Sequence, residues 1–271
     1  MPLSNTLVLV RGGGDLASGA IYRLHRVGFP IVVAELPRPV AVRRAVSFAE
    51  ALYNGEMIVE GITARRAADA NEARAATARG EVAVMADPDG DCRRLLAPPI
   101  LIDGRMAKAN LGTRIDDAPL VVGLGPGFTA GLDCHAVVET MRGHTLGRVI
   151  WQGSAIPNTG VPEGVLGYDR QRVLRAPCDG RLRLRRDIGD RLSEGDAVAE
   201  VDGRAVLAPF AGVLRGIARD GLEVAAGMKI GDVDPRGVRG HCFTISDKAL
   251  AVGGGVLEAV MVWMRSVERE S

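Results

Sequence analysis

The sequence has few aromatic residues and no excess of charge of either sign. Phe, Trp and Tyr make up 4% of the 271 residues, and 34 Lys and Arg residues stand against 33 Asp and Glu residues. Proteins that bind single-stranded nucleic acid stack bases on aromatic side chains, and binding by general phosphate neutralisation needs a basic surplus. The composition therefore predicts no nucleic-acid partner.

Long apolar runs and paired cysteines are also missing. No segment approaches the roughly 18 consecutive apolar residues of a membrane span, and Met1–Val10 lacks the basic start of a signal peptide. The cysteines form no C-x-x-C pair, which excludes a zinc knuckle and a thioredoxin-type motif; they are Cys92, Cys134, Cys178 and Cys242. We therefore expect a cytoplasmic protein without a membrane span, a metal site or a disulfide framework.

A glycine-rich turn lies near the start of the chain, between a predicted strand and a predicted helix. Leu7–Val10 is typical of a buried parallel strand, Ala20–Val27 has helical apolar spacing, and Ile31–Ala34 predicts a second strand. The turn matches the G-x-G-x-x-G/A fingerprint of dinucleotide-binding folds, with an acid after the second strand. The residues expected to bind a cofactor here are Gly12, Gly13, Gly14, Asp15, Ala17, Ser18 and Glu35.

Each part of this turn has a physical role in the expected site. Glycines let the backbone approach a phosphate, and the start of a helix supplies N–H groups and a positive dipole end. Glu35 would bind a ribose hydroxyl, whereas Asp15 would repel a pyrophosphate unless it caps the helix or holds a metal. A tight strand–helix turn without a ligand would show the same glycines, so both interpretations stay open.

A second glycine-rich segment follows the predicted strand Leu120–Val122. We expect this segment to open a helix over Leu132–Met141, so that two phosphate-binding loops face one crevice at the carboxyl edge of a parallel sheet. The expected cofactor contacts are Gly123, Gly125, Gly127 and Thr129.

Three residues in that predicted helix are the candidates for catalysis. His135 and Glu139 are spaced to share one helix face, where they could share a metal or relay a proton. Cys134 would lie near the helix N-terminus, which lowers the pKa of a thiol. The alternatives are a surface His–Glu pair and a small buried packing cysteine.

Residues 176–234 contain an internal duplication. Ala176-Pro177-x-x-Gly180-x-Leu182 recurs 32 residues later as Ala208-Pro209-x-x-Gly212-x-Leu214. Two interlocking halves of short strands are typical of the barrel-sandwich hybrid fold of biotinyl and lipoyl carrier domains. The junction turn is Asp202-Gly203, a good type I′ hairpin without the carrier lysine. We therefore expect a binding or docking module with no covalent biotin or lipoate.

The expected fold is α/β, a Rossmann-like parallel sheet with this small all-β module inserted. Ser246 can cap a final helix, which Gly253-Gly254-Gly255 would weaken unless close packing requires bare backbone. The expected domains are residues 1–170 for the nucleotide-binding domain, 171–236 for the barrel-sandwich module and 237–271 for a segment that returns to the first domain.

Long motifs resemble those of the YqeB family, accessory proteins of selenium-dependent molybdenum hydroxylases. These motifs are Arg11–Gly19, Gly123–Gly131, Glu139–His144, Pro157–Gly160 and Gly231–Arg236. The resemblance covers nearly the whole chain. It implies a role in maturing a xanthine dehydrogenase-like molybdenum enzyme, similar in role to XdhC-type accessory proteins, and it implies no established reaction.

Three functions follow as hypotheses. The first is an accessory protein that binds a nucleotide-like ligand, such as a molybdopterin-type dinucleotide cofactor, and partners with a molybdenum hydroxylase apoenzyme. The second is a nicotinamide-dependent oxidoreductase that uses the same two loops. The third is a scaffold that docks the hydroxylase through the β module without a ligand. Whether the protein is an enzyme and whether it forms a homo-oligomer stay open.

Overall fold

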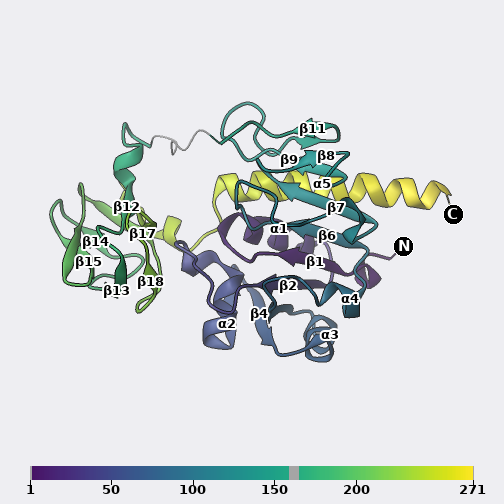
Figure 1. Ribbon diagram of the computed structural model, residues 1–271, viewed down its shortest axis with the longest axis horizontal. Coiled ribbons are helices and arrows are strands. Elements are labelled where there is room, and N and C mark those ends of the chain that lie inside the picture. Colours follow the sequence, from purple (N-terminus) through teal and green to yellow (C-terminus); the bar gives the residue numbers. More distant parts are fainter. Residues whose placement is uncertain (1, 159–164, 271) are drawn as a thin grey trace. The chain divides into compact units, whose positions relative to one another are not determined.

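The computed structural model describes residues 2–158 and 165–270, and it divides the chain into two compact units (Figure 1). Unit 1 comprises Met1–Pro39, Phe48–Asn158 and Ile245–Ser271, and unit 2 comprises Val40–Ser47 and Thr159–Thr244. Thr159 and Gly160, the end of one family motif, lie outside the described residues.

These boundaries differ from those expected at residues 171 and 236, and they add Val40–Ser47 to the second unit. The side chains of two arginines explain the addition. The Arg43 guanidinium donates to the backbone carbonyls of His241 and Thr244, at 2.9 Å each. Arg44 donates to the Ile217 carbonyl at 2.7 Å. The segment is thereby held by hydrogen bonds within unit 2.

Unit 1 is built on a nine-stranded, mostly parallel sheet. The strand order is β10-β9-β7-β6-β1-β2-β5-β4-β3, and only the edge strands β3 and β10 run antiparallel to their neighbours. The strands are β1 (Val8–Arg11), β2 (Ile31–Glu35), β3 (Glu56–Val59), β4 (Ile62–Ala67), β5 (Val82–Ala86), β6 (Ile100–Asp103), β7 (Leu120–Leu124), β9 (Ala136–Val138) and β10 (Val149–Ile150). The central strands are continuous apolar runs because both faces of the sheet are buried.

Short elements and helices complete unit 1. A small separate pair consists of β8 (Thr129–Ala130) and β11 (Gly153–Ser154). The α-helices are α1 (Asp15–Arg26), α2 (Ala51–Asn54), α3 (Ala70–Ala78), α4 (Arg93–Leu96) and α5 (Asp247–Glu270), and the 3-10 turns are η1 (Leu3–Asn5), η3 (Phe48–Glu50) and η4 (Ile115–Asp117). The connection from β5 to β6 crosses to the other side of β1, so the sheet is doubly wound with its switch point between β1 and β6.

One of the predicted helices is wrong. The segment Leu132–Met141 is a turn followed by β9, because the His135 N–H bonds the Val121 carbonyl at 2.9 Å in register with β7. The consecutive buried residues of β9 suit a strand covered on both faces.

The glycine triplet in α5 serves close packing. A Cβ atom on Gly253 would overlap the backbone of Gly19 in α1, and one on Gly19 would overlap the backbone of Ala249. The two helices therefore approach through bare backbone, and α5 continues unbroken. Its Ser246 cap is confirmed, since Oγ accepts the Ala249 N–H at 3.1 Å.

Helix α5 is also long and apolar enough to cross a membrane by length and composition, with a mean hydropathy of 1.4 over an 18-residue window within Asp247–Arg269. This is weak evidence, since a core helix meets the same criteria. Val252, Val256 and Ala259 are fully buried within unit 1.

Unit 2 contains two four-stranded antiparallel sheets. One has the order β12-β19-β17-β14 and the other β16-β15-β13-β18. The strands are β12 (Val173–Arg175), β13 (Gly180–Leu184), β14 (Arg191–Leu192), β15 (Ala197–Val201), β16 (Arg204–Leu207), β17 (Gly212–Ile217), β18 (Glu223–Val224) and β19 (Lys229–Asp234); the 3-10 turns are η2 (Arg44–Val46), η5 (Arg170–Arg172) and η6 (Arg239–Cys242).

The duplication seen in the sequence relates these sheets strand by strand. β13, β14 and β15 of the first half correspond to β17, β18 and β19 of the second, and each sheet takes strands from both halves. The junction turn has positive φ at Asp202 (43°) and Gly203 (79°), as a type I′ hairpin requires. The two halves are therefore interlocked around one core.

Candidate functional site

The first glycine loop joins β1 to α1 at the carboxyl edge of the parallel sheet, beside the switch point. Gly12 has φ +89°, a conformation that favours glycine, and its N–H donates to the Ala34 carbonyl at 2.8 Å. The Gly13 N–H donates to Glu35 Oε2 at 2.8 Å, and the Leu36 N–H donates to Oε1 at 2.7 Å. The structure thus brings the predicted acid and the predicted loop into direct contact.

The start of α1 is open at one position. Gly14 is the N-cap residue with φ −71°, no side chain caps the helix there, and a Cβ atom at Gly14 would have no heavy atom within 4 Å. Asp15 is the first helical residue, so it does not cap the helix; a carboxylate is favourable there because of the helix dipole.

Two other residues of the loop are structural. Ser18 is fully buried, and its Oγ donates to the Gly13 carbonyl and accepts the Phe48 N–H, both at 3.3 Å. Ala17 is fully buried, and a Cβ on Gly104 would lie 2.8 Å from the Ala17 Cβ. These contacts fix the path of the loop and leave open space at Gly14.

A buried charged network fills the switch point beside the loop. Asp103, at the end of β6, is 1% exposed and pairs with the Arg105 guanidinium at 2.5 Å. Thr113 Oγ1 donates to Asp103 at 2.6 Å, and Arg11 at the end of β1 donates to Thr113 Oγ1 at 2.7 Å. Burial, together with the neighbouring Arg105 charge, lowers the pKa of the Arg11 guanidinium.

Sequence reasoning missed this network, which we call the switch-point network: Arg11, Asp103, Arg105 and Thr113. The sequence contained one sign of this network, a charged residue directly after each of two short apolar runs, at positions 11 and 103. The backbone of Arg105 also lies 3.0 Å from where a Cβ on Gly12 would stand. The loop after β6 therefore covers one side of the glycine loop.

The second glycine-rich segment is packed against the protein's own atoms. A Cβ on Gly123 would meet the Phe128 ring, one on Gly125 would overlap Thr140, and one on Gly127 would lie 2.7 Å from the backbone of Ala109. Gly125 and Gly127 also have φ values of +75° and +109°. Because no helix follows, the helix N-terminus expected to bind a phosphate is missing here.

Thr129 has partners of its own in this segment. Its Oγ1 lies 2.9 Å from Ser154 Oγ, and its N–H donates to Asp133 Oδ2 at 2.8 Å. Asp133 therefore closes a turn around Thr129.

The three catalytic candidates do not form a common site. Cys134 is fully buried, and burial raises the pKa of its thiol to about 12. The expectation of a lowered pKa is therefore wrong, because the helix that would have lowered it is absent. The alternative of a small buried packing cysteine is the one that fits.

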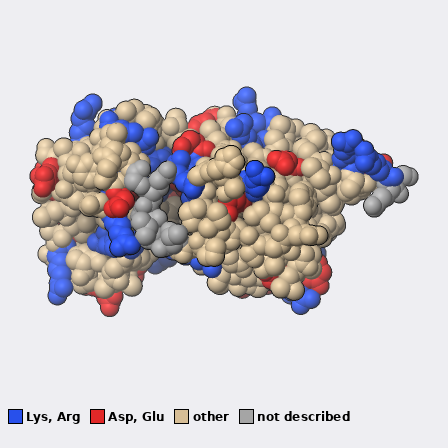
Figure 2. All heavy atoms as spheres, turned by 90° about the horizontal axis from the view of Figure 1, so that it is seen from above, with Lys and Arg blue, Asp and Glu red and all other residues tan. Residues whose placement is uncertain are grey.

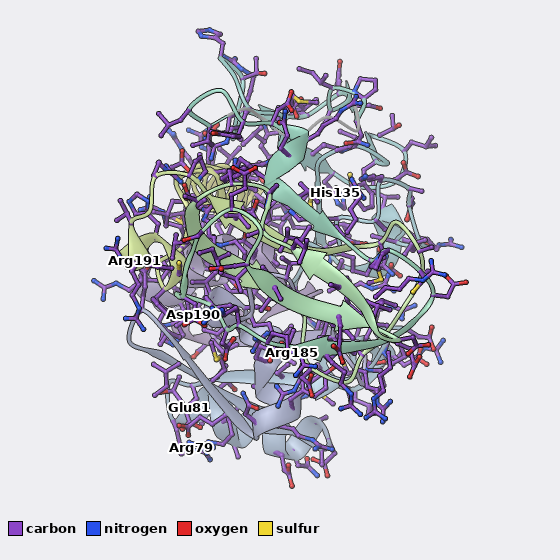
Figure 3. All side chains as sticks on the ribbon, turned by 90° about the vertical axis from the view of Figure 1, so that its left-hand side faces the viewer. Arg79, Glu81, His135, Arg185, Asp190 and Arg191 are labelled. Atoms are coloured by element: carbon purple, nitrogen blue, oxygen red, sulfur yellow. The ribbon has the colours of Figure 1, made fainter. Side chains whose placement is uncertain are left out.

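His135 and Glu139 are also engaged separately. His135 (labelled in Figure 3) accepts the Val121 N–H at Nδ1, at 3.0 Å, and burial lowers the pKa of its ring. Glu139 is 2% exposed, and its carboxylate accepts the N–H groups of Met141 at 2.6 Å and Ile156 at 2.8 Å. The two residues flank β9, and because each side chain accepts backbone N–H groups of its own, they do not form a pair.

The surface carries no dominant charge on the face seen in Figure 2, where basic and acidic side chains are interspersed. Among the residues that the structure describes, no group of three or more His, Cys, Asp and Glu could hold a metal ion.

Fold and site together define a doubly wound α/β protein with a glycine loop at its switch point, joined to a duplicated all-β unit. The chain is 49% identical over 263 residues to "Uncharacterized protein YqeB" of Escherichia coli strain K12. This match covers 97% of the chain and 49% of YqeB, so the chain spans about half the length of the curated relative it matches. The similarity supports the relation to the YqeB family that the motifs indicated.

No protein-family model matches the chain. Among solved structures, it is similar to the ectoine utilization protein EutE (DoeB) from Ruegeria pomeroyi, at 12% identity and a TM-score of 0.24, over 83% of this chain and 56% of that one. It is also similar to an aspartoacylase family protein from Mesorhizobium loti, at 12% identity and a TM-score of 0.29, over 84% of both chains. Likeness at this level supports no conclusion about function.

Proposed function

We propose that unit 1 binds the phosphate and ribose part of a nucleotide-bearing ligand at the loop Gly12–Ser18, with Glu35 as the ribose-binding acid. The observation that carries this proposal is the contact of the Glu35 carboxylate with the Gly13 N–H. The acid and the glycine loop that share a nucleotide in dinucleotide-binding folds therefore lie within hydrogen-bond distance of each other. An ionised carboxylate has about four acceptor positions, so two backbone donors leave Glu35 able to accept from ribose hydroxyls.

The start of α1 supplies the phosphate site in this proposal. The open space at Gly14 lets a phosphate approach the backbone, and the helix contributes N–H groups and the positive end of its dipole. The Asp15 carboxylate at the helix start repels a highly charged phosphate group. The helix dipole offsets part of this repulsion, and the ligand would gain the rest of its affinity from contacts made by its other groups.

The biological role we propose is that of an accessory protein in the maturation of a molybdenum hydroxylase, with the hydroxylase apoenzyme as partner in the cytoplasm. The similarity to YqeB and the family motifs support this role. The ligand would be a molybdopterin-type dinucleotide cofactor. A binding role suits unit 1 better than catalysis, because Cys134, His135 and Glu139 are buried or bonded to backbone groups.

We further propose that unit 2 is a barrel-sandwich hybrid module that docks the partner. Its support is the interlocking of two repeats, with each sheet drawn from both halves. The turn at the place of the carrier lysine is Asp202-Gly203, so the module would carry no covalent biotin or lipoate.

Mass spectrometry of small molecules released from the purified protein tests the ligand directly. Calorimetry with ADP-ribose, CDP, GDP and NADH then measures affinity for wild type, Gly14→Val and Glu35→Gln. Because Gly14 has an extended backbone and open space, the valine variant should fold and should lose at least tenfold in affinity, about 1.4 kcal/mol. Gly254→Ala in α5, which also has open space, is the control.

Unchanged affinity in a folded Gly14→Val variant would show that the loop is only a structural turn. Turnover of NADH by the purified protein would instead support the nicotinamide-dependent oxidoreductase. If a variant that binds no nucleotide still matured the hydroxylase, only the docking role would remain supported.

A further inference from the structure

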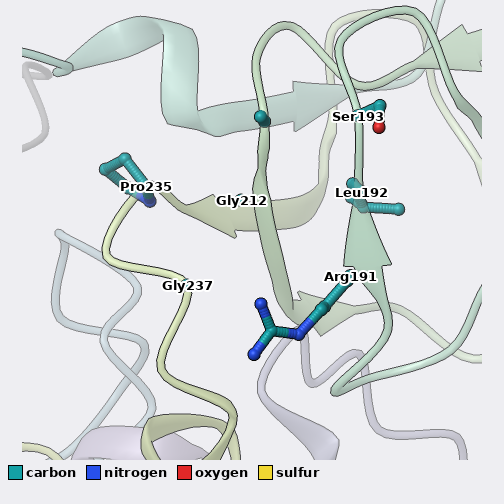
Figure 4. Close-up of a pocket in the computed structure, with 7 residues that line it drawn as sticks. Arg191, Leu192, Ser193, Gly212, Pro235 and Gly237 are labelled. Carbon is teal, nitrogen blue, oxygen red and sulfur yellow. The ribbon is translucent and has the colours of Figure 1, made fainter.

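A cavity of about 380 Å³ opens in unit 2, at the place where the two halves of the repeat meet. It lies between β14, the start of β17 and the segment that follows β19 (Figure 4). Its lining residues are Arg191, Leu192, Ser193, Ala211, Gly212, Pro235 and Gly237. The volume is at the lower end of the range for small-molecule sites, which is about 300–1,000 Å³.

The cavity contains an arginine without an anionic partner. The Arg191 side chain extends from β14 toward the segment at Gly237 (Figure 4). Among the residues that the structure describes, no carboxylate forms an ion pair with Arg191. An arginine guanidinium binds carboxylates and phosphates through parallel N–H donors, so its place in a cavity points to an anionic ligand.

The repeat provides an internal comparison for this place. At the cavity, β14 of the first half pairs with β17 of the second half through Leu192 and Gly212. At the place that the repeat makes equivalent, β18 of the second half pairs with β13 of the first half through Val224 and Gly180, each 32 residues away. The backbone is therefore duplicated at both places, and only the side chains differ.

The place equivalent to the cavity is filled by carboxylates. Asp179 Oδ1 accepts the Ala226 N–H at 2.7 Å, and Asp202 Oδ1 accepts the Arg181 N–H at 3.0 Å. A Cβ on Gly180 would overlap the Asp202 carboxyl group, so this side chain closes the space above the strand.

At the cavity these carboxylates are missing. Ala211 stands where the equivalent place has Asp179, and Arg191 stands where it has Glu223. The Glu194 N–H, which is equivalent to the Ala226 N–H that Asp179 binds, has no acceptor among the described residues. The cavity is therefore lined by the exposed Arg191, with the Glu194 N–H directly after the lining residue Ser193, and it lacks the carboxylate that its duplicate contains.

The segment after β19, which lines the cavity opposite β14, is fixed by hydrogen bonds to Asp234. Asp234 is fully buried, and its carboxylate binds the Arg236 side chain at 2.6 Å and the Arg236 N–H at 3.0 Å. Burial by itself would raise the pKa of Asp234, but these hydrogen bonds outweigh it and lower the pKa. Asp234 is thus committed to Arg236 and does not turn into the cavity as its duplicate Asp202 does.

We propose that this cavity binds a small carboxylic acid, whose carboxylate takes the place that the Asp179 side chain occupies in the other half. Arg191 and the Glu194 N–H hold the carboxylate, and the Ser193 hydroxyl adds a donor beside them. The apolar side chains of Leu192, Ala211 and Pro235 contact the short carbon body. This site is separate from the nucleotide site proposed in unit 1.

Calorimetry and NMR titration of the full chain with acetate, butyrate, succinate and inorganic phosphate test the proposal. We expect succinate or butyrate to bind more tightly than acetate, and to shift the amide signals of Ser193 and Glu194. Arg191→Gln should weaken this binding at least tenfold. Arg204→Gln is the matched control, because Arg204 is also exposed and without a carboxylate partner, and it lies outside the cavity.

Ala211→Asp transfers the carboxylate of the first half into the cavity. This variant should abolish binding and raise the melting temperature, because the new side chain can accept the Glu194 N–H. No binding of any carboxylate at millimolar concentration, binding of phosphate alone, or equal loss in Arg191→Gln and Arg204→Gln would each overturn the proposal. Folding of every variant is checked by its melting temperature.

Discussion

Glu139 was a catalytic candidate, but in the structure its carboxylate binds two backbone N–H groups. The loss of these hydrogen bonds should lower the stability of the protein by a measurable amount. Its buried carboxylate holds the N–H groups of Met141 and Ile156, which lie on separate segments after β9 and after β10. In Glu139→Gln, one of the two oxygens becomes an NH₂ group that faces a backbone N–H. One buried donor then lacks an acceptor, which costs about 1–3 kcal/mol.

That cost translates into a fall of the melting temperature of about 2–12 °C, at roughly 2–4 °C per kcal/mol for a protein of this size. Differential scanning calorimetry measures it, with Glu258→Gln as the control. Glu258 is an exposed glutamate on α5 with no partner among the described residues, so its amide should leave the melting temperature within about 1 °C.

The refuting result is a Glu139→Gln variant with the melting temperature of the wild type and no hydroxylase maturation. Such a variant would show that Glu139 acts on a ligand or a reaction and that its two backbone bonds contribute little. A parallel loss of stability and of maturation, recovered at lower temperature, would support the structural role.

Four further outcomes can be measured. Asp103→Ala should lower the free energy of unfolding by about 3–5 kcal/mol in a urea titration, because it leaves the largely buried Arg105 guanidinium without its anion and Thr113 Oγ1 without its acceptor. Iodoacetamide at pH 8 should leave Cys134 unmodified in the folded protein, as mass spectrometry can check, because the pKa of that thiol is about 12. Gly19→Ala should destabilise by about 1–3 kcal/mol or more through overlap with α5, measured by thermal unfolding. The hydrogen bond from Arg65 lowers the pKa of Glu81 to about 2 from 4.5, so its contribution to stability is present above pH 4.5 and is lost as the pH falls toward 2; in Arg65→Gln that acid-side loss should shrink.

The first strand–loop–helix–strand unit could be predicted because every signal in it is local. Short apolar runs, a glycine fingerprint and an acid at a fixed distance depend only on neighbouring residues, and the structure keeps them together at Gly13 and Glu35. The duplication was equally visible, because a fixed offset of 32 residues survives in the sequence. The pairing of strands across the halves follows from it.

The segment after the second glycine loop could not be assigned from local pattern. Ala136–Val138 is a short apolar run, and such a run fits a buried strand as well as a helix turn. Pairing with β7 decided the outcome, and this is a tertiary contact. The spacing of His135 and Glu139 then no longer brought them within one helical turn, because an extended chain separates residues four apart by roughly 13 Å. The attachment of Val40–Ser47 to unit 2 likewise depends on Arg43 reaching carbonyl groups about 200 residues away.

The switch-point network determines how a ligand could be bound in unit 1. Arg11 and Arg105 look like anion-binding residues, but both guanidinium groups already donate to Thr113, and Arg105 also binds Asp103. Drawing Arg105 onto a phosphate would leave the Asp103 carboxylate buried without its partner, a loss of about 3–5 kcal/mol that the new contact would have to exceed. The affinity for a nucleotide should therefore come from the backbone at Gly14, the dipole of α1 and the Glu35 carboxylate. Salt should accordingly weaken nucleotide binding less than it would at an arginine-lined site. A phosphate held by backbone dipoles releases fewer counterions on binding than one that pairs with arginine side chains.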